Sequence, residues 1–228
     1  MDTLKKELLE LLKEKGAALV GVANMNGVEN CDYPVGISVA LPIPKHTVED
    51  LKTAPTKEYY DLYHSLNSKL NGIVEEGEAF LREKGYHAFA NTTEVVKADA
   101  NSCTPLPHKT VATRAGLGWI GKSCILVTPE YGGAIRISTL LTDAPLPADE
   151  AITESRCGGC CKCVEACPAQ ALTGTNWKAG MAREELADIA ACEKTIRARM
   201  QELYGFEFTI CGKCFAICPY TQKYLNEQ

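Results

Sequence analysis

Apolar residues recur at helical spacing in three parts of the chain. The first 16 residues carry leucines three or four positions apart among lysines and glutamates, which predicts an amphipathic N-terminal helix. Similar spacing across 56–84 predicts one long helix, or two that break near Gly72 or Gly77, with a C-cap at Gly85. The third part is 181–204, described below. A shorter helix is expected at 108–115, after Pro105 and Pro107.

Short runs of β-branched and small apolar residues predict strands between these helices. We expect about five strands, at 17–23, 35–43, 86–91, 124–128 and 134–142. The sequence "PEYGG" between the last two is a hairpin signal. Strands that alternate with helices predict an α/β or α+β domain, sandwich-like, through about residue 145.

The pattern changes after this point. Residues 143–155 contain prolines and acids without periodicity, which indicates a linker. A helix is expected at 181–204, with an incomplete apolar stripe. The last 75 or so residues have too few apolar side chains for a conventional core. We therefore expect two domains, 1–145 and 146–228, the second held together by its cysteines.

Composition and charge argue against a nucleic-acid-binding, membrane-spanning or secreted protein. The 228 residues carry a net charge of −5, with no basic face typical of a nucleic-acid binder. No apolar run approaches the ~20 residues that span a bilayer, and the N-terminus lacks the features of a secretory signal. We expect a cytoplasmic protein that does not bind membranes. Because thiols stay reduced there, clustered cysteines indicate metal ligands rather than disulfides.

The cysteines follow the spacing of two-cluster ferredoxins. Cys157, Cys160, Cys163 and Cys167 form C-x2-C-x2-C-x3-C-P, and in such proteins the fourth cysteine ligates the other cluster. Cys211, Cys214 and Cys218 repeat the C-x2-C-x3-C-P ending, and Cys192 supplies the missing ligand. We therefore expect two [4Fe–4S] clusters in a ferredoxin-like domain. The first is held by Cys157, Cys160, Cys163 and Cys218, and the second by Cys167, Cys192, Cys211 and Cys214.

The alternative is a pair of zinc sites, because C-x2-C is also a zinc signature. Zinc ribbons do not usually need a third cysteine two residues on, nor paired Cys-Pro endings. Nine cysteines lie between positions 157 and 218 and two clusters need eight, so Cys161 is left over. Cys31, Cys103 and Cys124 are isolated and are expected to be small buried side chains.

A glycine-rich segment, "RAGLGWIGK", precedes the expected hairpin. Gly116, Gly118 and Gly121 allow backbone to approach a ligand closely, while Arg114 and Lys122 add positive charge. The segment follows a helix and precedes a strand, the reverse of a dinucleotide fingerprint, so NAD binding is not expected. The alternative is a turn that packs Trp119 into the core.

The ordered set of segments resembles the epoxyqueuosine reductase family, which is related to the reductive dehalogenases. It comprises "RAGLGWIGKSCILVTPEYG", "LLTDAPL", the C-x2-C-x2-C-x3-C-P motif, the lone Cys192 and "CGKCFAICPY". The resemblance implies a cobalamin-dependent iron–sulfur reductase. The clusters would receive electrons from a low-potential donor such as ferredoxin or flavodoxin and pass them to the cobalt of a corrinoid (cobalamin), which reduces a small-molecule or protein-bound acceptor. By position, the implied corrinoid contacts are Arg114, Gly116, Gly118, Trp119, Gly121, Lys122, Leu126, Val127 and Thr128.

The sequence differs from the family at two points. The family's general acid, an aspartate, falls on Ser102, and a serine hydroxyl is a poor acid near neutral pH. Asp99 is the candidate replacement, the alternative being that it only turns the backbone. Reductases of this family also continue into a helical-repeat region that holds tRNA, whereas this sequence ends ten residues after Cys218. Because the net charge of the chain is also negative, a tRNA partner is not expected.

The sequence is also compatible with two other functions. One is an electron-transfer or corrinoid-activating protein without substrate turnover of its own. The other is a structural iron–sulfur module of a larger complex.

Overall fold

The structure, a computed structural model, describes residues 3–53 and 55–227. It divides into two compact units, each assembled from three segments. The sheet unit comprises the chain up to Pro42, His64–Gly118 and Ile135–Ile152. The cysteine unit comprises Ile43–Tyr63, Trp119–Ala134 and the chain from Thr153 onward. Each unit is described by itself.

The sheet unit is built on four antiparallel strands in the order β1-β2-β6-β3. These are β1 (Leu19–Asn24), β2 (Val35–Pro42), β3 (Ala88–Asn91) and β6 (Ile135–Thr142). Every residue of β2 except Pro42 is buried, because helices cover both faces of this central strand.

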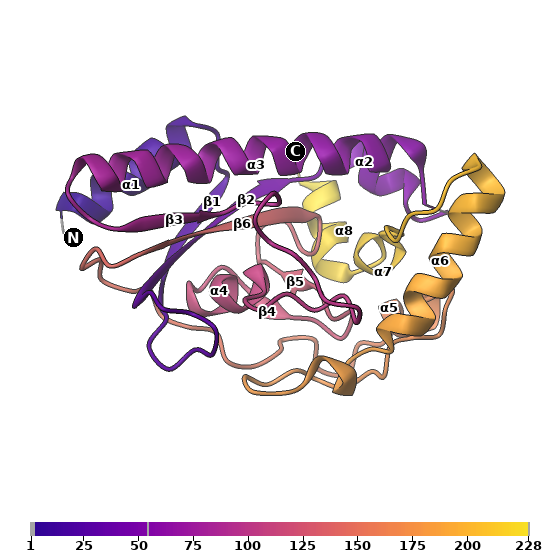
Figure 1. Ribbon diagram of the computed structural model, residues 1–228. Helices are drawn as coiled ribbons and strands as arrows, with labels where there is room; N and C mark the ends of the chain where they lie inside the picture. Colours follow the sequence, from indigo (N-terminus) through magenta and orange to yellow (C-terminus); the bar gives the residue numbers. More distant parts are fainter. Residues whose placement is uncertain (1–2, 54, 228) are drawn as a thin grey trace. The chain divides into compact units, whose positions relative to one another are not determined.

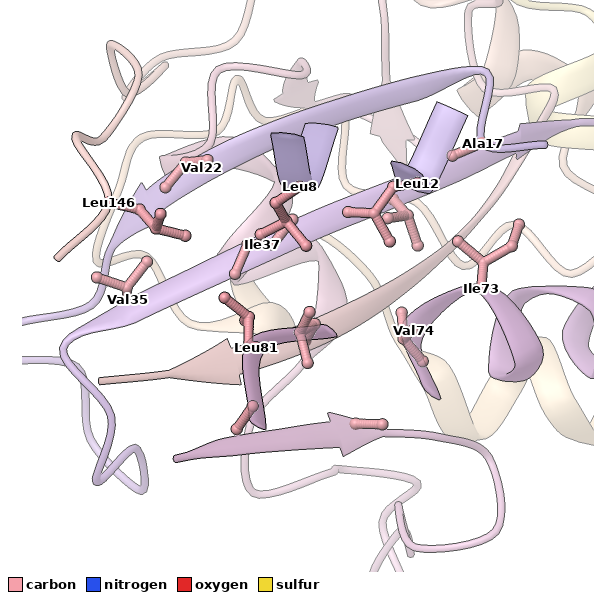
Figure 2. Close-up of a cluster of buried hydrophobic side chains, with 14 of the residues drawn as sticks. Leu8, Leu12, Ala17, Val22, Val35, Ile37, Ile73, Val74, Leu81 and Leu146 are labelled. Atoms are coloured by element: carbon pink, nitrogen blue, oxygen red, sulfur yellow. The ribbon is translucent and has the colours of Figure 1, made fainter. Parts of the chain in front are cut away.

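Helices α1 (Thr3–Glu14) and α3 (Lys57–Glu83) cover one face of the sheet (Figure 1). Their apolar stripes, which include Leu8, Leu12 and Val74, meet Ile37 of β2 and Val22 of β1 in one core (Figure 2). The amphipathic spacing of the sequence produces this packing, because residues three and four apart share a helix face. Residues 57–63 of α3 group with the cysteine unit.

Helix α4 (His108–Arg114) packs on the opposite face, against β1, β2 and β6. Alternation along β2 points Ile37 to the first core and Gly36 to α4. A Cβ atom on Gly36 would lie 2.8 Å from Cγ1 of Val111, so glycine is what lets α4 approach this closely. The sheet therefore carries helices on both faces.

Most predicted elements of the sheet unit are confirmed, with bounds shifted by at most two residues. The region 56–84 forms a single helix that passes through Gly72 and Gly77, and Gly85 follows it with φ +89°. The predicted hairpin between 124–128 and 134–142 is wrong. The strand β5 (Leu126–Val127) pairs instead with β4 (Trp119–Ile120), a strand that was not predicted. β6 is long and apolar enough to enter the larger sheet between β2 and β3.

The cysteine unit contains short elements joined by ordered loops. Its helices are α2 (Lys45–Asp50), α5 (Lys162–Ala166), α6 (Ile189–Tyr204), α7 (Lys213–Ala216) and α8 (Pro219–Asn226). Aromatic rings supply part of its packing: the Tyr60 ring lies 4.9 Å from that of Phe206 and 4.8 Å from that of Phe208.

The helix predicted at 181–204 is shorter than expected. A 3-10 turn occupies Arg183–Glu185, and α6 begins only at Ile189. The side chain of Asp188 accepts a hydrogen bond from the Ala191 amide at 2.9 Å, which caps the first turn. Leu172 pairs with Ala187 in an isolated bridge just before this cap, so the preceding backbone is extended rather than helical.

The predicted linker 143–155 has no helix or strand, apart from a bridge between Glu154 and Lys178. It is nonetheless fixed to the sheet unit, because the Asp149 carboxylate accepts hydrogen bonds from the Val22 amide at 2.7 Å and the Lys5 ammonium at 2.6 Å. The division into domains 1–145 and 146–228 stays a prediction. The two compact units alternate along the sequence, since residues 43–63 and 119–134 group with the cysteine-rich segment.

Candidate metal centre

The first cysteine motif is a tight loop that runs into α5. The Cys160 amide donates to the Cys157 carbonyl at 3.1 Å, which turns the loop back on itself. Cys163 lies within α5, and Cys167 is its C-cap residue, followed by Pro168. Because a proline cannot continue the helix, the backbone leaves α5 in an extended conformation at Cys167 (φ −67°, ψ 116°).

The second motif repeats this arrangement with α7 and α8. Cys214 lies in α7, and Cys218 is the N-cap residue of α8, with Pro219 as its first helical residue. Gly212 begins α7 with φ +84°, a conformation that suits glycine. The helices α5 and α7 pack against each other within the unit.

The predicted first group comprises the thiols of Cys157, Cys160, Cys163 and Cys218. Burial raises the pKa of Cys163 to about 11, and the charges of Cys157, Cys218 and Cys160 add to the rise. Burial also raises the pKa of Cys218, again with contributions from Cys157 and Cys160. Backbone N–H groups of Tyr220 and Thr221, in the first turn of α8, oppose this effect by hydrogen bonding to Cys218. The fourth cysteine of this group therefore comes from the second motif.

The predicted second group comprises the thiols of Cys167, Cys192, Cys211 and Cys214. Burial raises the pKa of Cys192 to about 11, with Cys167 and Cys211 as the next contributors. The pKa of Cys214 is raised well above its ordinary value by burial and by the charges of Cys211, Cys192, Cys163 and Cys167. The contribution from Cys163 shows that the two groups adjoin. Cys192 reaches its group from the first turn of α6.

The chemistry of the predicted donor set fits a pair of cubanes. A [4Fe–4S] cluster takes four cysteine thiolates, and the two predicted groups supply eight. In the part of the chain that the structure describes, no three His, Cys, Asp or Glu side chains are arranged to hold one metal ion. Since burial raises the pKa of several thiols, iron must displace their protons when it binds.

Cys161 stands beside the first group with a different partner. Its Sγ is 3.7 Å from the Nζ of Lys122, a lysine with 5% of its surface exposed. Cys31 and Cys103 belong to the sheet unit, and Cys124 is buried in the cysteine unit.

The "PEYGG" turn packs against the helices of the second cysteine motif, a role that its sequence pattern does not predict. The Gly133 amide donates to Oγ1 of Thr221, in α8, at 2.9 Å. A Cβ atom on Gly133 would lie 2.6 Å from the Cβ of Phe215, in α7. The two adjacent glycines were a visible signal, but they were interpreted as a hairpin turn. The structure shows that they make room for the helices that carry Cys214 and Cys218.

The nine predicted corrinoid contacts divide at the boundary between the units. Arg114, Gly116 and Gly118 belong to the sheet unit, and Trp119, Gly121, Lys122, Leu126, Val127 and Thr128 to the cysteine unit. Several already have partners in their own unit. Arg114 donates to the Asn24 carbonyl at 2.8 Å, Gly116 abuts the Glu150 carbonyl, and Thr128 accepts from the Tyr131 amide at 3.1 Å. Their role as corrinoid contacts stays a prediction.

Asp99 is exposed in a loop of the sheet unit. Its carboxylate accepts hydrogen bonds from the amides of Asn101 at 2.9 Å and Cys103 at 2.8 Å. Ser102, which occupies the position of the family's acid, has φ +57°. These contacts give Asp99 a structural role in turning the loop, and its catalytic role stays a prediction.

Comparison with known proteins places this centre in a recognised type of domain. Residues 156–221 match the family described as "4Fe-4S double cluster binding domain". The chain is 32% identical over 116 residues to the epoxyqueuosine reductase of Bacillus cereus, which is 50% of this chain and 29% of that protein. It is 29% identical over 166 residues to that of Lactococcus garvieae, 71% of this chain and 42% of that protein. The matched stretch is thus less than half of each relative.

Solved structures show the same fold. An epoxyqueuosine reductase with an epoxyqueuosine-modified tRNA-Tyr stem loop has a TM-score of 0.61 and 23% identity, covering 96% of this chain and 65% of that one. A reductive dehalogenase whose structure suggests a mechanism for B12-dependent dehalogenation has a TM-score of 0.67 and 19% identity, covering 93% of this chain and 31% of that one. The chain therefore resembles the epoxyqueuosine reductases, shares its fold with them and with a reductive dehalogenase, and carries a double [4Fe–4S] cluster binding domain.

Proposed function

We propose that this chain is an iron–sulfur oxidoreductase resembling epoxyqueuosine reductase. Electrons from a low-potential donor such as ferredoxin or flavodoxin pass through two [4Fe–4S] clusters to a bound cobalamin, which when present supplies a strongly reducing metal for an unidentified substrate. The observation that carries the proposal is the exchange of cysteines between the two motifs. The charge of Cys218 contributes to the raised pKa of Cys163, in the first group, and the charge of Cys167 contributes to the raised pKa of Cys192, in the second.

The proposed ligand sets follow from this exchange. Cys157, Cys160, Cys163 and Cys218 hold cluster one, and Cys167, Cys192, Cys211 and Cys214 hold cluster two. The charge of Cys163, in the first group, contributes to the raised pKa of Cys214, in the second, so thiols of the two groups lie near one another. Adjacent clusters suit stepwise passage of single electrons. The chain's own contribution is to bury the sulfurs and to hold the two groups next to each other.

The cobalamin is proposed on the resemblance and on the B12-dependent relative of similar fold. Within the cysteine unit, Lys122 lies 3.7 Å from Sγ of Cys161, and the ring of Trp119 lies 5.3 Å from the guanidinium of Arg156, the residue before Cys157. Both residues belong to the segment that the resemblance assigns to the corrinoid. The proton donor for the reduction is also a proposal, with Asp99 as the candidate.

Anaerobic reconstitution with iron, sulfide and cobalamin tests this function. We expect about eight irons per chain and a shift in the visible spectrum of added cob(II)alamin. About two zinc ions per chain in place of iron would remove the cluster assignment. If the protein does not bind corrinoid at micromolar concentration, the proposal of a cobalamin cofactor fails.

A turnover assay under strong reductant then separates enzyme from electron carrier. An epoxyqueuosine-modified tRNA stem loop is the first substrate to try, because a relative of the same fold was solved with one. Loss of the epoxide would identify tRNA as the substrate, against the expectation from charge. Reduction of a partner corrinoid protein without turnover of any acceptor would favour the electron-transfer alternative.

A further inference from the structure

Two buried N–H groups in the cysteine unit have no acceptor. Among the residues that the structure describes, the side-chain Nε1 of Trp119 and Nε of Arg199 lack any hydrogen-bond partner. Both residues belong to the unit that holds the cysteine groups. A buried donor without an acceptor loses its hydration and gains nothing in return, so proteins rarely leave one. Each of these groups calls for an acceptor that the polypeptide does not supply.

Trp119 lies beside the first cysteine group. The Trp119 side chain is fully buried, and its ring packs edge to face with the ring of Tyr220, with 4.8 Å between the ring centres. Tyr220 follows Cys218 by two residues. The guanidinium of Arg156, the residue before Cys157, lies 5.3 Å from the centre of the Trp119 ring.

The direction of the strand supports the same placement. Side chains two positions apart in extended chain share a face, and a Cβ atom on Gly121 would lie 3.6 Å from Sγ of Cys157. Trp119 therefore extends from β4 on the face that Cys157 occupies.

Arg199 lies beside the second cysteine group. It follows Cys192 by seven residues in α6, so the two share one face of the helix with Ile196, which is buried. The Nε of Arg199 is itself buried, so the guanidinium lies inside the unit on the face of α6 that carries Cys192.

We infer that Trp119 and Arg199 are positioning residues, each donating a hydrogen bond to sulfur of a different cluster, Trp119 to cluster one and Arg199 to cluster two. The inference rests on the proposed function only in that both clusters must be bound. The thiolates and sulfides of a cubane carry negative charge and accept N–H bonds. Reduction adds one electron from the donor, so the reduced cluster gains more from the bond than the oxidised one. Each bond thus raises the reduction potential of its own cluster.

Redox titration of the iron-loaded, cobalamin-free protein, followed by electron paramagnetic resonance, tests this inference. Trp119→Phe keeps an aromatic ring but removes the N–H, and Arg199→Met keeps the aliphatic stem but removes the guanidinium. At a fixed poise we expect the reduced-to-oxidised ratio of cluster one to fall about tenfold in W119F, equivalent to about 59 mV for a one-electron couple. Cluster two should shift likewise in R199M. The cluster whose donor is intact should not move in either variant.

The control variant is Arg197→Met. Arg197 lies on the same helix, but its side chain is 47% exposed and 3.6 Å from the Glu193 carboxylate. Its removal should leave both potentials unchanged. If R197M shifts cluster two as much as R199M does, general charge rather than a hydrogen bond sets the potential, and the inference for Arg199 fails.

A measurement on the unmutated chain covers the case in which W119F does not fold. Protein labelled with ¹⁵N in the tryptophan indole should show a nitrogen coupling to reduced cluster one in pulsed resonance. The chain has two tryptophans, and the coupling should persist in Trp177→Phe. Full iron content with no coupling would overturn the inference for Trp119 while leaving the proposed function intact. Iron far below eight atoms in the unmutated chain would instead contradict the cluster assignment itself.

Discussion

The glycine pair that follows β5 offers a steric test of how the cluster helices are held. Gly133 has no backbone conformation that requires glycine, so a Gly133→Ala substitution adds only a methyl group. That methyl would lie 2.6 Å from the Cβ of Phe215, an atom that no change of rotamer can move. The α7 backbone must therefore shift by about 1 Å to reach ordinary contact distance.

Overpacking of this kind costs about 1–3 kcal/mol. For a chain of this size each kcal/mol lowers the melting temperature by about 2–4 °C, so we expect a loss of about 2–12 °C. Because Phe215 lies between Cys214 and Cys218, we also expect slower cluster assembly and faster bleaching of cluster absorbance in air. Thermal melting of reconstituted protein and time courses of the visible absorbance measure both effects.

Gly159→Ala provides the matched control. It lies in the first cysteine loop, and a Cβ atom there would meet nothing within 4 Å. G159A should melt within about 1 °C of the unmutated protein, since surface changes of this kind seldom exceed about 0.5 kcal/mol. If G133A is as stable as G159A, the packing of this turn against α7 does not hold the centre, and the reasoning is refuted.

Three further predictions concern ligands, pH and capping. Cys192→Ala should lose or alter one cluster, whereas Cys161→Ala should keep about eight irons; equal iron in both would show that α6 supplies no ligand. Burial lowers the pKa of His108 to about 4, with Arg136 adding to the effect, so the unfolded chain binds more protons than the folded one below pH 6.5. Stability should be full above that pH and fall by about 3 kcal/mol as pH approaches 4; denaturation of the His108→Gln variant should lack this component, and identical pH profiles would contradict it. Asp188→Ala removes the cap of α6 and should cost about 1 kcal/mol in urea unfolding, a cost that Asp188→Ser should largely restore; an unchanged midpoint in the alanine variant would show that the cap contributes little.

In the described residues, no helix is long and apolar enough to span a bilayer, as the sequence also indicated. Local pattern determined much of the rest. The leucine spacing of α1, the apolar stripe of α3 and the β-branched run of β2 each specify an element because the relevant contacts recur within a few residues. Cysteine spacing predicts two groups of four by the same local logic, and this assignment of ligands stays a prediction.

Tertiary structure decided where those elements go. The sequence could not show that β6 leaves its neighbour β5 to lie between β2 and β3, because strand partners are chosen by long-range burial. Nor could it show that two glycines face Phe215 and Thr221, or that Trp119 and Arg199 are buried without acceptors. Spacing along a chain fixes which side chains share a face. Only the packing of distant segments determines what that face meets.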